Sequence, residues 1–432
     1  MQDDSTATLY AVPETSGVSS LPPISDESAI FKGIQERFRE QFEKAFPDKL
    51  APKTVVILPS LTLDQEILSK VKGVVHYEER LLCLLMLLRM PRTHVIYLTS
   101  TTIDPAIIDY YLHLLPGITG YHALQRLTLL SCYDASSKSL TEKILERPRL
   151  IERIRKSIPG DHVAHMACFN VTPYERTLAV KLNIPIFGCD PDLLNLGSKS
   201  SSRQIFRECN LLVPEGYEDL YSKQEAIDAL VKLKLQNPAL RKAVVKINDG
   251  FSGEGNALFY FDTSEDIDDW QGWVTEQLTE RLKIVADDLS CENFFAKFKE
   301  MGGIVESFVE GDIKESPSVQ CRIDPDGNCR VVSTHDQLLG GEGGQVFLGA
   351  YFPAQPAYAP EIGAMGKQVA ESLQQKGVLG RFAVDFISVL DNSSWKHYAI
   401  EINLRKGGTT HPLLMLQFLT DGEYDYKKGI YS

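Results

Sequence analysis

Two carboxylates and an amide lie near the C-terminus in a spacing that suits metal binding, within VDFI (384–387) and AIEINLR (399–405). Alternate residues of a strand share a face, so Glu401 and Asn403 should point to the same side. The intervening Asp-Asn-Ser-Ser turn predicts a hairpin, which can bring Asp385 beside them. Hard oxygen ligands of this kind suit Mg²⁺ that bridges nucleotide phosphates. A solvated polar face on an edge hairpin is the structural alternative.

An arginine stands two residues beyond this set. If the strand continues, Arg405 points to the same face as Glu401 and Asn403. A guanidinium at that place can reach the charge that develops on a transferring phosphoryl group. We therefore predict that Arg405 is a catalytic residue.

A lysine and a glycine-rich turn form a second candidate site, in the segment AVVKINDGFSGEGNALF. Lys246 ends a predicted buried strand, and Gly250, Gly253 and Gly255 occupy the turn after it. Glycines let backbone N–H groups approach phosphate oxygens closely, and a lysine supplies a positive charge beside them. The segment is not a Walker loop, because no Gly-Lys-Ser/Thr ends it and a strand follows. A plain hairpin is the structural alternative.

A third segment, IVESFVEGDIKES at 304–316, is a strand that leads into a short extended linker. The main chain of such a linker can offer N–H and C=O groups to the edge of an adenine. A carboxylate further along can then bind ribose hydroxyls. A plain strand with solvated acidic residues explains the same pattern.

The elements that must position these residues fall into distinct regions of the 432-residue chain. Apolar β-branched runs such as KTVVILPS (53–60) alternate with stretches of helical spacing, which predicts a parallel α/β sheet. Residues 81–90 are the most apolar run and predict a buried helix. From Pro191 the pattern changes to strands joined by glycine-rich turns, with an acidic helix in two pieces at 264–301.

The predicted organisation is an arm, an α/β domain and an α+β domain, at 1–25, 26–190 and 191–432. Hydrophobic residues make up 43% of the chain and charged residues 24%, which is the ordinary globular range. The formal net charge of −13 and the absence of a Lys/Arg block argue against a nucleic-acid-binding face. We expect reduced cysteines, no membrane span, no signal peptide and a cytoplasmic location.

Taken together and in this order, four segments resemble the ATP-grasp superfamily. They are a lysine in GSKSSSRQIFRECNLLVP, the lysine in VVKINDGFSGEG, the VESFVEG strand, and an Asp followed by Glu-x-Asn-x-Arg, over about residues 190–412. The preceding α/β region looks like the pre-ATP-grasp domain that such ligases carry. STHDQLLGGEGGQVFLGAYFP with EINLRKGGTTHP is most similar to pheganomycin-type peptide ligases. The resemblance implies an ATP-grasp fold whose central lid lobe (about 220–310) and C-terminal catalytic lobe (about 311–432) clasp ATP.

The resemblance also implies which residues contact the phosphates of ATP. Lys199 and Lys246 would contact the α- and β-phosphates, and Lys246 would also serve catalysis. The glycine turn would cover the β- and γ-phosphates as a mobile lid. The turn residues concerned are Gly250, Ser252, Gly253 and Gly255.

For the rest of the nucleotide, the resemblance assigns the third segment. The backbones of Ser307 and Val309 would bind adenine, with Glu306 close by. A carboxylate after the hinge would bind ribose. Since DIK interrupts the family pattern there, we place this carboxylate at Glu315, with Glu310 and Asp312 as the alternatives.

For the metal, the resemblance implies one or two Mg²⁺ ions, or Mn²⁺, held by Asp385, Glu401 and Asn403. Arg405 would stabilise an acyl-phosphate and the tetrahedral species that follows it. Phosphoryl transfer depends on charge neutralisation and alignment rather than on a protein nucleophile. The chain accordingly has no Gly-x-Ser-x-Gly elbow.

The implied activity is ATP-dependent ligation of a small-molecule or peptide carboxylate to an amine, through an acyl-phosphate. An ATP-grasp phosphotransferase, a carboxylate–thiol ligase and a non-catalytic nucleotide-binding scaffold are the alternatives. We expect neither a nucleic-acid nor a membrane partner. Ligases of this type are often dimers, so a homodimer is a further expectation.

Four further side chains are candidates for the substrate site. His335 precedes the GGEGG loop at 340–344 and could line the acceptor site, or it could belong to a satisfied polar cluster. Arg322 and Arg381 could bind a substrate carboxylate in a bidentate manner, or form structural pairs. His411 follows the GGTT sequence near the metal motif and could orient a substrate.

Overall fold

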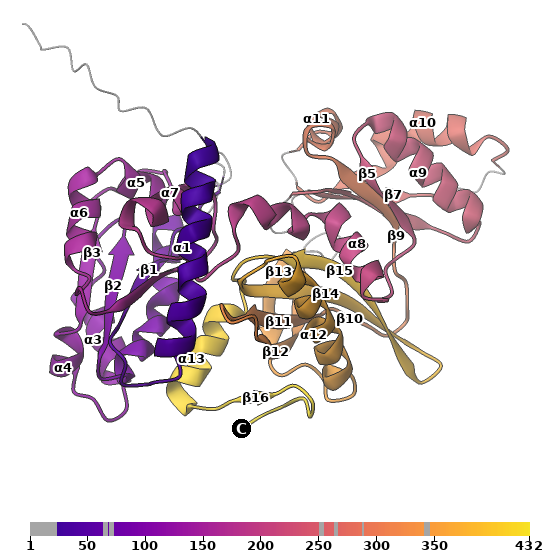
Figure 1. Ribbon diagram of the computed structural model, residues 1–432. Coiled ribbons are helices and arrows are strands. Elements are labelled where there is room, and N and C mark those ends of the chain that lie inside the picture. Colours follow the sequence, from indigo (N-terminus) through magenta and orange to yellow (C-terminus); the bar gives the residue numbers. More distant parts are fainter. Residues whose placement is uncertain are drawn as a thin grey trace, which may run out of the picture.

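The computed structural model describes residues 24–63, 68, 73–249, 255–262, 267–286, 289–340 and 346–432. An N-terminal unit is built on a parallel sheet with the strand order β3-β2-β1-β4 (Figure 1). Every residue of β1 is buried, as expected for a parallel strand covered on both faces. The strands are β1 (Lys53–Leu58), β2 (Thr93–Thr99), β3 (Leu127–Ser131) and β4 (Val163–Cys168).

Helices cover both faces of this sheet. One face packs against α1 (Ile24–Ala45), α5 (Leu140–Leu145), α6 (Pro148–Lys156) and α7 (Pro173–Leu182). The other face packs against η1 (Val74–Arg89), α3 (Pro105–His113) and α4 (Gly120–Leu124). The predicted alternation of strands and helices is confirmed. The leucine-rich run at 81–90 is helical and buried as expected, but it belongs to a 3₁₀ helix, η1.

A second unit contains an antiparallel sheet with the order β5-β9-β6-β7-β8. Helices α9 (Lys223–Gln236), α10 (Trp270–Arg281) and α11 (Cys291–Met301) pack on it around a core of their own. The acidic stretch at 264–301 is helical in two pieces as predicted, but strand β8 separates them. The strands are β5 (Gly216–Leu220), β6 (Lys242–Ile247), β7 (Asn256–Tyr260), β8 (Leu282–Ile284) and β9 (Gly303–Ser307).

A third unit contains a sheet with the order β10-β14-β11-β12-β13, to which β15 adds beside β14. Helix α12 (Ala359–Gln375) packs on this sheet, and α8 (Lys199–Glu208), which follows η2 (Pro191–Gly197), packs on β15. The strands are β10 (Lys314–Glu315), β11 (Pro317–Ile323), β12 (Cys329–Gly340), β13 (Val346–Tyr351), β14 (Gly380–Asp391) and β15 (Ser394–Asn403). The predicted α+β half is thus present as two antiparallel lobes.

The turn between β14 and β15 follows the sequence prediction closely. Asn392 and Ser393 form its centre with φ of 46° and 69°. Positive φ at both central residues is the signature of the type I′ turn, whose twist matches that of the two strands. The turn therefore fixes the register of the hairpin on which the metal-type residues lie.

Helix α13 (Thr410–Thr420) joins the third unit to the first (Figure 1). Its Phe418 is buried in the cluster formed by η1, α3 and the N-terminal sheet. Just before α13, the Lys406 amide donates to the Phe169 carbonyl at 3.2 Å, and the Lys406 ammonium donates to the Cys168 carbonyl. The segment after β15 is therefore held against the carboxyl end of β4. A short hairpin of β16 (Tyr424–Asp425) and β17 (Ile430–Tyr431) ends the chain.

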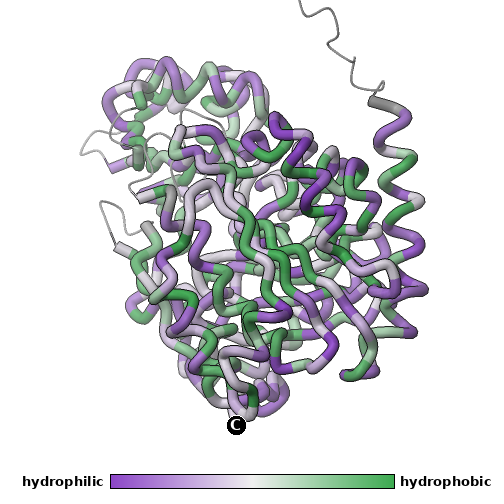
Figure 2. Tube along the Cα trace, turned by 90° about the vertical axis from the view of Figure 1, so that its left-hand side faces the viewer, coloured by the Kyte–Doolittle hydropathy of each residue, from purple (hydrophilic) through white to green (hydrophobic). Residues whose placement is uncertain are grey.

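Hydropathy follows these layers. In Figure 2 the hydrophobic colour runs along the central strands, whereas the helices of the outer layers alternate between polar and apolar residues. This alternation is what amphipathic helices on a buried sheet require. Across the described residues, no helix combines the length and the apolar character that crossing a membrane would need.

Candidate active site

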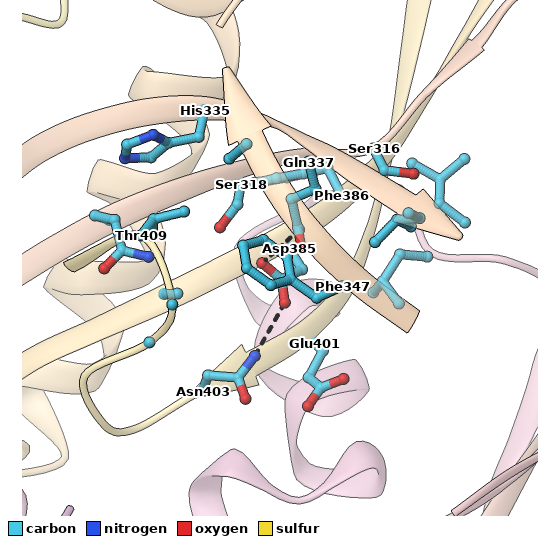
Figure 3. A pocket seen from close by; sticks show the side chains of 18 of the residues that line it. Ser316, Ser318, His335, Gln337, Phe347, Asp385, Phe386, Glu401, Asn403 and Thr409 are labelled. Carbon is cyan, nitrogen blue, oxygen red and sulfur yellow. Dashed lines mark hydrogen bonds between the residues drawn. The ribbon is translucent and has the colours of Figure 1, made fainter. Parts of the chain in front are cut away.

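A cavity of about 960 Å³ opens where the three units meet. Its walls come from strands β6 and β9, from the third sheet and its following loop, and from η1 of the N-terminal unit. We call the sheet that contains β6 and β9 the lid sheet, after the lid lobe predicted for this part of the chain. The carboxylates Asp385 and Glu401 and the amide of Asn403 all line it. The hairpin prediction had placed these three residues on one face, and the structure brings them together there (Figure 3).

The register of the hairpin explains the meeting of the two carboxylates. Asp385 is paired directly with Glu401, and a bulge follows between Asp385 and Phe386. The Asn403 amide nitrogen donates to Asp385 Oδ2 at 3.0 Å, which leaves the Asn403 oxygen as an acceptor. The Gln337 amide nitrogen donates to Asp385 Oδ1 at 3.1 Å. Two carboxylates and an amide oxygen therefore face one volume, a donor set that fits a hard divalent cation.

The two carboxylates differ in their electrostatics. Burial, together with the neighbouring charge of Glu401, raises the pKa of Asp385 to about 6. Burial alone would also raise the pKa of Glu401. The ammonium of Lys199 and, with smaller effects, Lys246 and Arg405 outweigh the burial and hold the pKa of Glu401 below its usual value. Added positive charge at this pair would favour the ionised form of Asp385.

Lys199 reaches Glu401 because α8 is bound to β15. The Lys199 ammonium lies 2.9 Å from Glu401 Oε1, across 202 residues of sequence. Ser198 caps the helix by accepting from the Ser201 amide, and the Ile402 amide donates to Ser202 Oγ at 3.1 Å. The first turn of α8 is thus fixed against the strand that carries the candidate metal ligands.

A buried ion-pair network links the lid sheet to α8. Glu306 is 2% exposed and accepts from Arg203 Nη1 at 2.7 Å, while its other oxygen lies 2.6 Å from the Lys246 ammonium. Arg203 is 1% exposed and also donates to the Pro214 carbonyl. Glu306 also lines the cavity, and its predicted place close to adenine stays a prediction. Its carboxylate pairs with two cations, because a buried carboxylate requires paired charge.

The hinge after β9 lines the cavity through Ser307, Phe308 and Val309, in agreement with the expected position of the third segment. The Ser307 amide already donates to the Glu215 carbonyl at 2.7 Å, so the backbone of Ser307 could offer an adenine only its carbonyl. The Lys314 ammonium lies 4.4 Å above the Phe308 ring and also faces the cavity.

The three ribose candidates are not among the described lining residues, although Lys314 and Ser316 on either side of Glu315 are. The Glu310 carboxylate is 3.2 Å from the exposed Arg241 guanidinium. Glu315, the favoured candidate, accepts from the Gln355 amide at 3.0 Å. Asp312 is exposed in the linker. The short strand β10 pairs with β14 and sets the direction of this linker, which its sequence pattern does not indicate.

Two of the four substrate candidates line the cavity, His335 and His411. Burial lowers the pKa of His335 to about 4, and its Nε2 lies 2.8 Å from Ser333 Oγ. Burial and the nearby Arg80 lower the pKa of His411 to about 4. Both rings are therefore neutral at pH 7 and can serve as hydrogen-bonding groups rather than as cations.

The two arginine candidates do not belong to the described lining of the cavity. Arg322 pairs with Asp324 at 2.6 Å, which is the structural alternative considered for it. Arg381 stands opposite Arg322 in the sheet, and burial lowers its pKa to about 10. Both arginines lie near one end of the paired strands β11 and β14, four residues along the strand from the Ser318–Asp385 pair. The strand period keeps them on the same face as Asp385, but they lie too far along the sheet to reach the cavity.

Arg405 reaches the cavity by a different route from the one predicted. Strand β15 ends at Asn403, and the Arg405 amide donates to the Asn403 carbonyl at 2.8 Å, which turns the chain. The expectation of a continuous strand through Arg405 is therefore wrong. Its side chain still lines the cavity and donates to the Lys406 carbonyl at 3.2 Å.

Part of the predicted glycine turn lies outside the described residues, namely Gly250, Ser252 and Gly253, as does most of the GGEGG segment. Gly255 is described and lines the cavity, where its carbonyl accepts from the Ile247 amide at 2.9 Å. Lys246 also lines it, at the end of β6 as expected.

Several lining residues were missed by the sequence reasoning. They include Tyr77, Arg80, Phe169 and Thr409. The i,i+3 spacing of Tyr77 and Arg80 marks a helical face. The pattern could not say that this face meets the C-terminal sheet, because that contact depends on how α13 docks on η1.

The chain is similar in sequence to a known protein family and to individual proteins. The model of a family described as "IQCH-like, ATP-grasp" matches residues 192–285 and 274–427. L-propargylglycine–L-glutamate ligase from Streptantibioticus cattleyicolor is 31% identical over 367 residues, which are 83% of this chain and 72% of that protein. IQ motif-containing protein H from Danio rerio is 26% identical over 417 residues, and the match spans 39% of that longer protein.

Solved structures agree on the fold. The biotin carboxylase complex with β,γ-ATP from Campylobacter jejuni has a TM-score of 0.51 at 14% identity, over 88% of this chain and 71% of that one. The biotin carboxylase domain of 2-oxoglutarate carboxylase from Hydrogenobacter thermophilus has a TM-score of 0.50 at 11% identity, over 87% and 71%. The predicted fold class, a parallel α/β domain followed by a two-lobed α+β fold, is confirmed.

The buried network makes a prediction about stability. Glu306→Gln should lower the free energy of unfolding by about 3 kcal/mol, because the buried Lys246 loses its counter-charge and Arg203 keeps only its pair with Glu218. Urea unfolding followed by the fluorescence of Trp270 and Trp273, which pack on the lid core, measures the change. The matched control is Glu310→Gln, whose exposed pair with Arg241 should cost below about 1 kcal/mol. Equal effects of the two substitutions would contradict the prediction.

Proposed function

This chain belongs to the IQCH-like ATP-grasp family, and we propose that it is an ATP-dependent ligase that joins a carboxylate to an amine. The observation that carries this proposal is the convergence of charge on one cavity. Asp385, Glu401 and Asn403 face Lys199, Lys246 and Arg405 there, from segments that are far apart in the sequence. Anionic phosphates and a divalent cation are what such a mixed set of charges can hold together.

The nucleotide would lie between the lid sheet and the third sheet. Lys199 and Lys246 would contact its phosphates, since each ammonium is held at the cavity by a carboxylate that a phosphate can replace. The hinge at Ser307 to Val309 would receive the adenine, and the turn that ends at Gly255 would close over the phosphates. In this scheme residues 26–190 form the pre-ATP-grasp domain, about 220–310 the lid lobe and about 311–432 the catalytic lobe.

Asp385, Glu401 and the Asn403 oxygen would hold Mg²⁺. The cation would neutralise charge on the β- and γ-phosphates as the phosphoryl group transfers. In the structure Glu401 pairs with Lys199. The same carboxylate would thus pair with the lysine in the absence of ligands and with the metal ion in their presence. With Glu401 as a metal ligand, the Lys199 ammonium would be available to the phosphates. The ion pair thus keeps the buried lysine compensated until the nucleotide arrives.

The reaction follows from these positions. A carboxylate oxygen of the first substrate attacks the γ-phosphorus, and the bond to the bridging oxygen breaks to release ADP. The acyl-phosphate that forms has a good leaving group, which a free carboxylate lacks. The amine of the second substrate attacks the acyl carbon, loses a proton, and phosphate departs. Arg405 would stabilise the negative charge of the acyl-phosphate and of the tetrahedral species.

The choice of ligation over simple phosphoryl transfer is supported by the relative from Streptantibioticus cattleyicolor, which is named a ligase of two amino acids. A mixed pool of amino acids and dipeptides, supplied with ATP and Mg²⁺, tests it in an assay of ADP release. We expect ADP release that requires a carboxylate and an amine together, with a condensed product visible by mass spectrometry. ATP binding without turnover across the pool would instead favour a nucleotide-binding scaffold.

The metal assignment predicts that Glu401→Gln abolishes turnover while ATP binding in EDTA changes by less than about twofold. The substitution keeps the shape of the side chain but removes the charge that would hold the cation. Calorimetric titration with ATP, with and without Mg²⁺, separates the two effects. Glu371→Gln, an exposed change on α12, is the control and should retain turnover. Activity like that of the wild type in Glu401→Gln would refute the assignment.

The phosphate assignment predicts that Lys246→Ala raises the Kd for ATP about 10- to 100-fold. This is the size expected for one charge-assisted hydrogen bond to a phosphate. Equilibrium binding of a fluorescent ATP analogue gives the measurement. Lys232→Ala, at an exposed position on α9 of the same lobe, should leave the Kd unchanged. An unaltered Kd in Lys246→Ala would remove this lysine from the nucleotide site.

A further inference from the structure

One corner of the cavity is built by the N-terminal unit and is not needed for the ATP chemistry. Tyr77 and Arg80 of η1 line it, with Phe169 after β4 and with His411 and Leu416 of α13. We call these five residues the η1 corner. It belongs to the same cavity as the candidate metal ligands, so a substrate bound near the phosphates can extend into it.

Arg80 is the charged group of the η1 corner, and its charge is not compensated by a carboxylate within the described part of the chain. Its guanidinium stacks on the Tyr77 ring with 3.5 Å between the guanidinium carbon and the ring centroid. The side chain is half-buried, and its positive charge acts on the neighbouring His411. By contrast, Lys199 and Lys246 in the same cavity each pair with a carboxylate.

The contact with Tyr77 restricts the positions that the guanidinium can take. A ring beneath one face leaves the edge N–H groups of the guanidinium in its own plane, free to point into the cavity. Planar N–H groups of this kind bind a carboxylate with two parallel hydrogen bonds. Phe169 and Leu416 are apolar neighbours, which lower the local dielectric and strengthen such a contact.

We propose that Arg80 binds a carboxylate that does not react, on an amino acid or short peptide that serves as a substrate. This proposal rests on the ligase function above and narrows its substrate class. A ligase that joins two amino acids must distinguish the carboxylate that is phosphorylated from the one that remains free. Arg80, on the N-terminal wall, would bind the carboxylate that remains free. Asp385, Glu401 and Arg405 would act at the carboxylate that is phosphorylated.

A phosphate of ATP is the competing occupant, and the geometry argues against it. The nucleotide phosphates already have Lys199 at the start of α8 and Lys246 at the end of β6. Arg80 lies on a third wall, with α13 and the residue after β4. The neutral His411 beside it can donate or accept a hydrogen bond and adds no second positive charge, which suits a singly charged carboxylate better than a phosphate.

The test is a binding experiment that does not need turnover. The full chain is mixed with Mg²⁺, a non-hydrolysable ATP analogue and a pool of amino acids and dipeptides, and binding is followed by saturation-transfer NMR. A second pool contains the corresponding C-terminal amides. The variants are Arg80→Gln, Arg80→Lys and the control Arg92→Gln, an exposed arginine of the N-terminal unit that pairs with Asp161.

We expect at least one free acid to bind the wild type. Its binding should be at least tenfold weaker in Arg80→Gln, partly weakened in Arg80→Lys and unchanged in Arg92→Gln. The amides should bind weakly and equally to all four proteins, and the Kd of the ATP analogue should not change. The proposal is overturned if Arg80→Gln binds the free acids within twofold of the wild type, or if no free acid binds the wild type. It is also overturned if the substitution weakens binding of the ATP analogue instead. Failure of the ligase function would show separately, as wild-type protein that binds a free acid yet releases no ADP with any pair.

Discussion

The cavity depends on the pairing of buried charge. Glu306 is almost fully buried and is tolerated because Arg203 and Lys246 flank it, and Glu401 is paired with Lys199. Removing a carboxylate or an ammonium from water costs several kcal/mol, so an isolated member of this set would not remain charged in place. The ion pairs therefore determine more than local geometry. They require α8, β9 and β15 to approach one another, and that approach creates the space between the lid sheet and the third sheet.

Under the proposed function, the same pairs would give the site two states of similar electrostatic balance. Without nucleotide, each buried lysine has a carboxylate. With nucleotide and a cation, phosphates would pair with the lysines and Glu401 would bind the metal. Exchange of one partner for another avoids the penalty of a bare buried charge. Arg203 is different, because it bonds Glu306, Glu218 and the Pro214 carbonyl and is not among the residues that line the cavity. It anchors Glu306 while Lys246 is free to change partner, which explains why one carboxylate needs two cations.

Local pattern was enough to predict the fold class and the hairpin, and not enough to predict contacts between distant elements. The period of two and the Asn392–Ser393 turn fix which residues of β14 and β15 face together, so Asp385, Glu401 and Asn403 could be predicted as a set. Arg405 was misplaced because a strand pattern does not show where pairing stops. The ion pair of Glu306 with Arg203 was not predicted, because the two residues lie 103 positions apart and sequence spacing does not reveal a buried ion pair. Arg322 and Arg381 have the right face but the wrong distance along it.

The N-terminal unit shows why this limit matters for specificity. Nothing in the spacing of Tyr77 and Arg80 marks them as substrate residues, and they reach the cavity only because α13 docks on η1 and Lys406 ties the following segment to the end of β4. The residues that would hold ATP and the cation all come after position 190 and are constrained by one another's charge. The η1 corner carries no such constraint, since Arg80 has no carboxylate partner among the described residues. A substitution of Arg80 would therefore leave no buried carboxylate unpaired there. A change of side chain there could alter which acid binds without disturbing phosphoryl transfer. The proposed division of the cavity between a coupled catalytic wall and an uncoupled recognition wall would therefore be a consequence of where the buried charges are paired.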